Sequence, residues 1–199
     1  VGMLFTAKSP ITGWRFNTLL ATTHIALREV PKKLTTKLIH SKLDLFKDFC
    51  KTYIDKPTLK VAGLNPHAGE EGILGNEEKD WLNSALIAWN EKNRDIQLLG
   101  PLSPDSCWNS SAKAWINKDA ERHDGILAMY HDQGLIPMKV IALNYSVNTT
   151  IGLPFIRTSP DHGTGFDIAG KGIAQCQSMI EAIKAAIEMN KNSGLLNTH

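Results

Sequence analysis

Several features that would assign a chain to a class are missing from these 199 residues. The three cysteines, Cys50, Cys107 and Cys176, are far apart and form no CxxC pair, so neither a disulfide framework nor a cysteine-rich metal site is indicated. No apolar run reaches the roughly 18 residues that a membrane span requires. The N-terminal residues do not resemble a signal peptide. The 22 basic and 20 acidic residues give a formal charge of +2, and no basic run indicates a nucleic-acid or membrane surface. We therefore expect a cytoplasmic protein with no nucleic-acid or membrane partner.

What the sequence does contain is an alternation of strand-like and helix-like segments, with 42% hydrophobic residues. Strands are predicted over residues 2–6, 17–23, 58–64, 125–130 and 146–151, and helices over residues 36–53, from about 77 to 89, and 175–190. In the last helix an apolar stripe is expected to face inward, formed by Cys176, Met179, Ile180, Ile183 and Ile187. Strands separated by helices are typical of an α/β fold with a largely parallel sheet.

Three histidines follow predicted strands, at the points where these strands run out into loops. His24 follows Ala21-Thr22-Thr23, His67 lies in the segment NPHAGE, and His131 lies in YHDQG. Ligands of α/β folds bind at the carboxyl ends of the strands, and three imidazoles there could hold a divalent metal while leaving positions open for substrate. Each histidine taken singly is more often an ordinary polar residue, so their shared placement is what favours a metal site.

A second set of candidate residues is spaced at intervals of nine. Lys139, Asn148 and Arg157 combine two cationic side chains, which suit phosphate or carboxylate, with a neutral amide. Arg157 follows an apolar run, Gly152 to Ile156, which would hold it in place. The alternative is that Lys139 and Arg157 are ordinary surface charges.

A glycine-rich segment follows Arg157. Residues 159–172 contain four glycines within ten positions, which would let the backbone approach a ligand closely. The alternative is a tight connection before the last helix. A GxGxxG motif after the first strand is absent, so a Rossmann nucleotide site is not supported.

Five long stretches carry a specific likeness: LATTHIALREVP (20–31), VAGLNPHAGEEGILGNEE (61–78), GPLSPDSCW (100–108), DGILAMYHDQGLIPMK (124–139) and VNTTIGLPFIRTSPDHGTGFDIAGKG (147–172). They resemble the 4-hydroxythreonine-4-phosphate dehydrogenase family of vitamin B6 synthesis. The resemblance implies that His24, His67 and His131 are ligands of one divalent metal (zinc, magnesium or cobalt), within the chain or across a dimer interface. It also implies that Lys139, Asn148 and Arg157 bind substrate.

The loop HGTGFDIAGKGIA is similar to the HGSAPDIAGKGIA loop of isocitrate and isopropylmalate dehydrogenases. In those enzymes it packs around the adenosine part of the dinucleotide, and they share the α/β/α layers expected here. This likeness implies that the cofactor, NAD or NADP, is bound by a loop containing His162, Gly163, Thr164, Gly165 and Asp167. Those relatives use carboxylates for the metal where this chain has histidines, which distinguishes the two families.

The implied reaction is oxidation of 4-hydroxythreonine 4-phosphate by NAD(P) to a β-keto acid, which loses carbon dioxide to give 3-amino-2-oxopropyl phosphate. Asp132 is a candidate general base, or alternatively a partner that orients an imidazole. Family members are two-domain homodimers with further residues upstream that touch the substrate. We therefore expect residues 1–199 to be the C-terminal part of such an enzyme, dimeric and weakly active or inactive by itself.

Two alternatives stay open at the level of sequence. The first is a dehydrogenase of another four-carbon acid phosphate, such as erythronate or threonate 4-phosphate, because the metal and anion sites would look the same. The second is a non-catalytic metal-binding or dimerisation module. Three histidines without a nearby cysteine favour a catalytic over a structural metal site, because structural zinc usually has four protein ligands, many of them cysteine.

Overall fold

A computed structural model describes residues 1–193 of the chain. Its helices and strands are β1 (Gly2–Lys8), β2 (Arg15–Leu20), α1 (Val30–Lys33), α2 (Thr36–Lys51), β3 (Thr58–Ala62), α3 (Asn83–Lys92), β4 (Gln97–Leu102), α4 (Asn109–Ile116), β5 (Gly125–Ala128), α5 (His131–Ala142), β6 (Val147–Ile151), β7 (Arg157–Pro160) and α6 (Gln177–Ser193). A π-helical turn, Glu78–Leu82, leads into α3.

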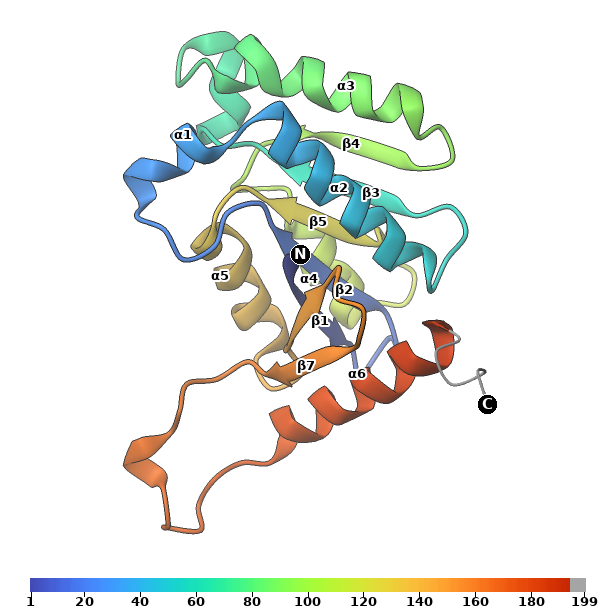
Figure 1. Ribbon diagram of the computed structural model, residues 1–199, viewed down its shortest axis with the longest axis vertical. Helices are drawn as coiled ribbons and strands as arrows, with labels where there is room; N and C mark the ends of the chain where they lie inside the picture. Colours follow the sequence, from blue (N-terminus) through green and yellow to red (C-terminus); the bar gives the residue numbers. More distant parts are fainter. Residues whose placement is uncertain (194–199) are drawn as a thin grey trace.

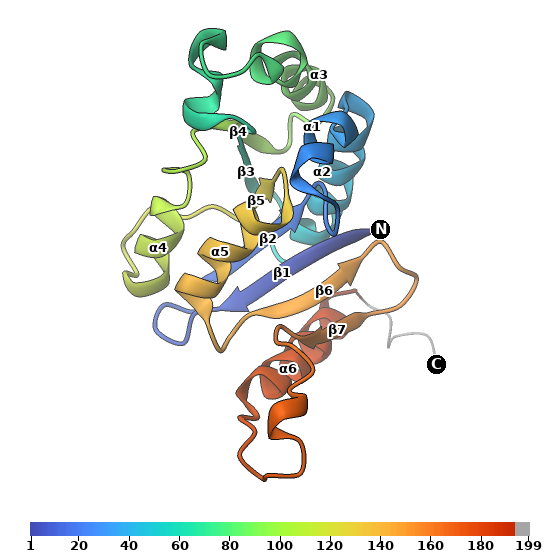
Figure 2. The same ribbon diagram turned by 90° about the vertical axis from the view of Figure 1, so that its left-hand side faces the viewer.

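One seven-stranded sheet, in the order β4-β3-β5-β2-β1-β6-β7, organises the chain (Figure 1). The strands β4, β3, β5 and β2 pair in parallel, whereas β1, β6 and β7 pair antiparallel. Helices α4 and α5 lie on one face of the sheet, and α2 and α3 lie on the other (Figure 2). The α/β class and its layers are confirmed.

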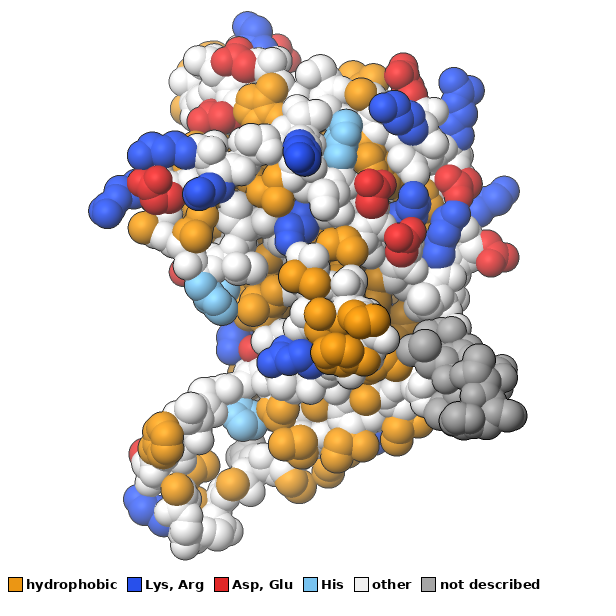
Figure 3. Space-filling view, in the orientation of Figure 1, with side chains coloured by type: hydrophobic (Ala, Val, Ile, Leu, Met, Phe, Trp, Pro, Cys, Tyr) orange, Lys and Arg blue, Asp and Glu red, His pale blue; other side chains and the backbone are white. Residues whose placement is uncertain are grey.

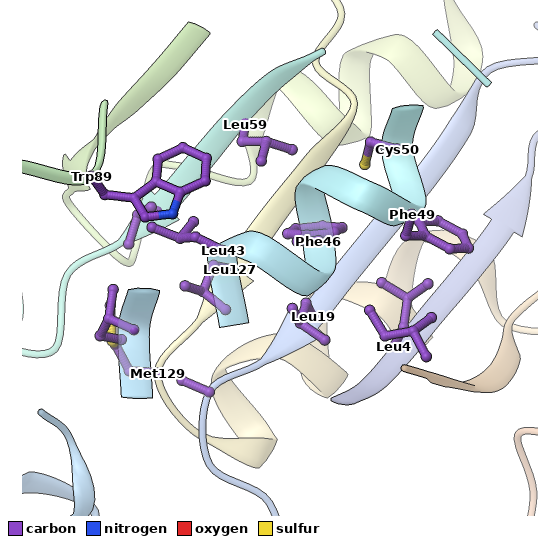
Figure 4. Packing of buried hydrophobic residues seen from close by; sticks show 14 of the residues in the cluster. Leu4, Leu19, Leu43, Phe46, Phe49, Cys50, Leu59, Trp89, Leu127 and Met129 are labelled. Carbon is purple, nitrogen blue, oxygen red and sulfur yellow. The ribbon is translucent and has the colours of Figure 1, made fainter. Parts of the chain in front are cut away.

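Helix α2 covers the centre of the sheet because its apolar residues recur at helical spacing. Thr35 caps its amino end by accepting a hydrogen bond from the amide of Leu38 (3.2 Å). The side chains of Ile39, Leu43 and Phe46 are fully buried. Figure 4 shows Leu43 and Phe46 facing the strands. Phe46 lies so close to Gly125 of β5 that a Cβ atom there would be 2.1 Å from the ring. The central helix and the central strand therefore depend on a glycine at that position.

Five of these elements were not predicted from the sequence: α1, α4, α5, β4 and β7. Strand β4 contains a Gly100-Pro101 pair, and α5 contains Gly134 and Pro137, which normally interrupt regular structure. Gly134 allows α5 to lie directly on β2, because an added Cβ would be 2.6 Å from the Leu20 side chain. Tertiary packing, which local sequence does not reveal, supports these segments.

The expected inward stripe of α6 is wrong. Ala182, Ala185 and Met189 are the buried residues, whereas Met179, Ile180, Ile183 and Ile187 are 38–54% exposed, and Cys176 is exposed too. The two alanines let the helix lie close to the sheet, so the large residues face outward. Figure 3 shows hydrophobic side chains along α6 and over the β6–β7 turn. The predicted fraying of residues 192–199 falls largely outside the described residues.

Candidate active site

The three strand-end histidines follow three neighbouring strands. Strands β2, β5 and β3 are adjacent and parallel in the sheet, so their carboxyl ends share one edge. His24 comes after β2, His131 after β5 and His67 after β3. His131 does not lie in a loop as expected, because it is the first residue of helix α5. The strand before it, β5, lies between β3 and β2 in the sheet and is the central one of the three.

His24 and His131 form a pair. Their ring centroids are 5.3 Å apart, and both rings line a pocket of about 250 Å³ together with Tyr130 and Asp132. The Asp132 Oδ1 atom lies 2.7 Å from Nδ1 of His131, which leaves Nε2 of that ring available to another partner. Two neighbouring imidazoles, one oriented by a carboxylate, suit a divalent transition metal. Among residues 1–193, however, no three His, Cys, Asp or Glu side chains come together as a ligand set.

His67 lies in an unusual left-handed turn. Five successive residues, from His67 to Glu71, have positive φ angles between 44° and 82°. Only one of the five is glycine, so the turn is strained and must be held by its surroundings. The holding group is Glu78, which is 2% exposed and whose Oε1 accepts hydrogen bonds from the amides of Leu64 (2.7 Å) and Asn65 (2.8 Å). The position of His67 therefore depends on Glu78, which the pattern of strand-end histidines did not reveal.

The three predicted anion-binding residues lie near the β6–β7 side of the sheet. In the strand register Asn148 pairs with Ser159, and Thr150 pairs with Arg157, so all four share one face. Arg157 donates a hydrogen bond from Nη1 to Oγ1 of Thr150 (2.9 Å). The Lys139 ammonium, on α5, lies 3.3 Å from Oδ1 of Asp161, directly after β7.

Two observations bear on a ligand at these residues. The Oδ1 atom of Asn148 is buried without a hydrogen-bond partner in the described part of the chain. Arg157 is exposed, so its guanidinium is accessible apart from its contact with Thr150. An unpaired acceptor beside accessible cationic groups suits a ligand that carries both hydroxyl or amine donors and an anionic group.

The glycine-rich segment projects from the body of the protein between β7 and α6 (Figure 1). No residue from His162 to Cys176 is buried, and Phe166 is 83% exposed. A Cβ atom at Gly163, Gly170 or Gly172 would meet nothing within 4 Å. The loop therefore offers its backbone to a ligand or another surface, and it is not a tight core connection.

A different environment surrounds His123, which the sequence placed in a polar turn. It is 1% exposed, stacks edge-on against Trp14 and shares a 2.8 Å hydrogen bond with Oγ of Ser111. Burial, reinforced by the nearby charge of Lys60, lowers the pKa of His123 to about 3. A neutral, buried imidazole of this kind is a structural group, remote from the strand-end histidines.

Comparison with known proteins identifies the family of the chain. The family model described as pyridoxal phosphate biosynthetic protein PdxA matches residues 1–186. The 4-hydroxythreonine-4-phosphate dehydrogenase of Synechococcus sp. (strain RCC307) is 56% identical over 189 residues, which cover 94% of this chain and 58% of the relative. The enzyme of that name from Synechocystis sp. is 53% identical and covers 94% and 54%. The chain thus spans a little over half the length of these relatives.

Solved structures give the same result. The crystal structure of 4-hydroxythreonine-4-phosphate dehydrogenase from Klebsiella pneumoniae superimposes with a TM-score of 0.76 at 34% identity, covering 95% of this chain and 54% of that one. A terephthalate 1,2-cis-dihydrodiol dehydrogenase from Burkholderia xenovorans superimposes with a TM-score of 0.64 at 27% identity, covering 94% and 55%. The same architecture therefore serves dehydrogenases of different substrates. Within residues 1–193, no helix is both long and apolar enough to cross a membrane.

Proposed function

The chain belongs to the PdxA family of pyridoxal phosphate biosynthetic proteins, and on that premise we propose that it takes part in the NAD(P)-dependent oxidation of 4-hydroxythreonine 4-phosphate. The product is a β-keto acid, which loses carbon dioxide to give 3-amino-2-oxopropyl phosphate. The observation that carries the proposal is the 56% identity to a dehydrogenase of that name across 94% of the chain. In this proposal residues 1–199 form the C-terminal part of a two-domain enzyme of the cytoplasm. The three cysteines, all free, suit that reducing compartment.

The metal belongs to this proposal. His24 and His131 are the two imidazoles that would hold it, and their proximity is the observation that fits. A divalent cation supplies a Lewis acid that polarises the substrate oxygen from which the proton is lost. Asp132 contributes by accepting a hydrogen bond from Nδ1–H of His131, which fixes the tautomer of the ring and leaves Nε2 free to bind the metal. We assign Asp132 this orienting role over that of general base, because its Oδ1 is already engaged.

Substrate and cofactor are held by the other residues of the prediction. Arg157 and Lys139 bind the anionic groups of the substrate, and Lys139 exchanges its contact with Asp161 for them. Asn148 accepts a hydrogen bond through its unpaired Oδ1. Together these residues would bind and orient the substrate, and NAD or NADP, when bound, would supply the hydride acceptor. The residues that would hold the adenosine part of NAD or NADP lie in one loop: His162, Gly163, Thr164, Gly165 and Asp167.

A homodimer completes the proposal. Two features support it: the exposed apolar residues Met179, Ile180, Ile183 and Ile187 of α6, and the separation of His67 from the His24–His131 pair. A second copy would cover apolar surface and bring its own His67 to the pair. The three histidines would then form one site across the interface.

The decisive experiment is a substrate panel. NAD(P)H formation by the full-length protein is followed with 4-hydroxythreonine, erythronate and threonate 4-phosphates, after its metal has been removed and Zn²⁺, Mg²⁺ or Co²⁺ restored. We expect the highest kcat/KM with 4-hydroxythreonine 4-phosphate and no turnover without metal. A higher kcat/KM with either sugar-acid phosphate would identify the alternative dehydrogenase.

The Synechococcus relative in full length is the reference for turnover. Because small misplacements of reacting groups lower rates by orders of magnitude, we expect the 199-residue chain by itself to be weakly active or inactive. Equal turnover numbers for the two proteins would contradict that expectation. Metal binding without turnover would instead favour a metal-binding module.

A further inference from the structure

The amide of Gln133 joins two of the strand ends that carry histidines. Gln133 lies in the first turn of α5, two residues after His131, and is 9% exposed. Its Oε1 atom accepts a hydrogen bond from the amide of Met129 (2.6 Å), directly after β5. Its Nε2 atom donates to the carbonyl of Gly63 (2.7 Å), directly after β3. The side chain thus replaces a backbone link where the two strands have ended.

Thr22 makes the equivalent link on the other side of β5. Its hydroxyl donates to the carbonyl of Met129 (2.7 Å), and its amide donates to the same oxygen (3.2 Å). The peptide groups of Met129 are therefore held by Gln133 on one side and by Thr22 on the other. The result is one continuous row of hydrogen bonds across the ends of β2, β5 and β3.

Each histidine follows this row at a short distance along the chain. His24 comes two residues after Thr22, His131 two residues after Met129, and His67 four residues after Gly63. The Gly63 end is also anchored, because the Glu78 carboxylate holds the next two amides. Because so few residues separate each histidine from this row, a displacement of the row would also displace all three imidazoles.

We propose that Gln133 is a positioning residue of the active site, which sets the three histidine-bearing strand ends in register for metal binding. The proposal rests on the proposed function, because the placement of each histidine matters only if it binds metal, in its own chain or in a site shared with a second copy. Residues behind metal ligands typically change metal affinity by about 10- to 100-fold when replaced. A residue that serves only to satisfy buried polar groups would change stability and leave the affinity of the folded protein unaltered.

Two substitutions test the two hydrogen bonds of Gln133, to Met129 and to Gly63. Gln133→Met retains the length of the side chain and removes both hydrogen bonds. Gln133→Glu retains the acceptor for the Met129 amide and places a carboxylate against the Gly63 carbonyl, so it breaks only the link to β3. The matched control is Asn17→Leu, because the buried Asn17 amide donates to the carbonyl of Asp124 (2.8 Å), at the opposite end of β5.

Two measurements are made on each folded variant: Zn²⁺ affinity by calorimetry, and the ring signals of ¹⁵N-labelled histidines by NMR without metal. We expect Gln133→Met to bind Zn²⁺ about 10- to 100-fold more weakly and to shift the signals of His24, His67 and His131. Gln133→Glu should shift His67 most. Asn17→Leu should retain wild-type affinity and leave these three signals in place.

The outcomes distinguish this inference from the function on which it rests. Wild-type Zn²⁺ affinity in Gln133→Met, with unshifted histidine signals, overturns the role of Gln133 and leaves the proposed function standing. Absence of Zn²⁺ binding by the wild-type protein overturns the metal site, and with it the role of Gln133 in metal binding. Equal losses of affinity in Gln133→Met and Asn17→Leu overturn positioning in favour of a general loss of structure.

Discussion

Two regions of the sheet differ in how firmly their candidate site residues are held: the carboxyl ends of β2, β5 and β3, and the region of β6 and β7. At the carboxyl ends of β2, β5 and β3, buried polar side chains such as Gln133 and Glu78 hold the backbone beyond the last strand hydrogen bonds. Around β6, β7 and the loop that follows, the candidate ligand-binding groups are largely exposed, and Asn148 retains an unpaired acceptor. The side that carries the histidines is held by buried polar groups, whereas the side proposed to bind substrate and cofactor is open.

This difference has a chemical consequence. Metal affinity depends on fixed ligand geometry, so it should be sensitive to buried residues behind the histidines. Binding of an anionic substrate and a dinucleotide tolerates a more open surface, which closes around the ligand when it is bound. Mutations on the two sides should therefore act on different quantities, which the following predictions test.

The largest effect is expected in the core beneath the side that carries the histidines. Phe46→Ala removes a fully buried ring that packs against Gly125, and should lower the free energy of unfolding by about 3–5 kcal/mol. Phe155→Ala, at a 59% exposed ring near β7, should change it by less than about 0.5 kcal/mol. Urea denaturation measures both. Similar losses for the two variants would show that the open side is packed as tightly as the core.

Next in size is the loss of the anion-binding arginine. Arg157→Ala should lower transition-state stabilisation by about 2–4 kcal/mol, because a charged substrate group would lose its partner. The quantity measured is kcat/KM, or the Kd of the substrate where turnover is below detection. Arg122→Ala is the control, since that exposed guanidinium contacts only the Lys118 carbonyl among the contacts described for it. An unchanged kcat/KM in Arg157→Ala would exclude its role.

The buried His123 should make the stability of the protein depend on pH. Because the pKa of folded His123 is about 3, the unfolded chain takes up a proton near pH 6.5 that the folded chain does not. Stability should therefore fall as the pH decreases from 6.5 toward 3, by up to about 1.4 kcal/mol per pH unit. His123→Gln should remove this contribution, which denaturation at a series of pH values measures. An identical pH dependence in both proteins would contradict a neutral buried His123.

The smallest effect on stability, with a large effect on assembly, is expected on α6. Ile183→Lys replaces a side chain that is 54% exposed, so the free energy of unfolding should change by about 0.5 kcal/mol or less. The fraction of dimer measured by light scattering should fall, since a charge would enter the apolar patch. Ile87→Lys, on α3 at 61% exposure, is the matched control. A wild-type protein that is strictly monomeric would contradict the homodimer.

Sequence alone predicted the α/β class, the helix α2 and the strands that lead to the three histidines. These features follow from hydrophobic periodicity, which is a local property. It did not predict α5, because Gly134 and Pro137 oppose a helix until α5 packs against β2. It also reversed the faces of α6, because large apolar residues suggest an inward stripe unless small residues such as Ala182 and Ala185 allow closer packing.

The candidate ligands were recognisable in the sequence, whereas the residues that hold them in place were not. His24, His67 and His131 are recognisable because each follows an apolar strand, and the family likeness reinforces that pattern. Gln133 and Glu78 are ordinary polar residues in the sequence. Their importance depends on burial and on backbone atoms far along the chain, up to 70 residues away for Gln133 and Gly63. No local pattern contains that information.

The most direct test of the account is to locate the metal. Crystals of the protein are grown with Co²⁺, and anomalous diffraction data identify the ion. We expect one peak per chain, at about 2.0–2.1 Å from a nitrogen of both His24 and His131, with a His67 side chain as a further ligand. A peak bound elsewhere, or one whose ligands exclude the His24–His131 pair, would contradict the central claim.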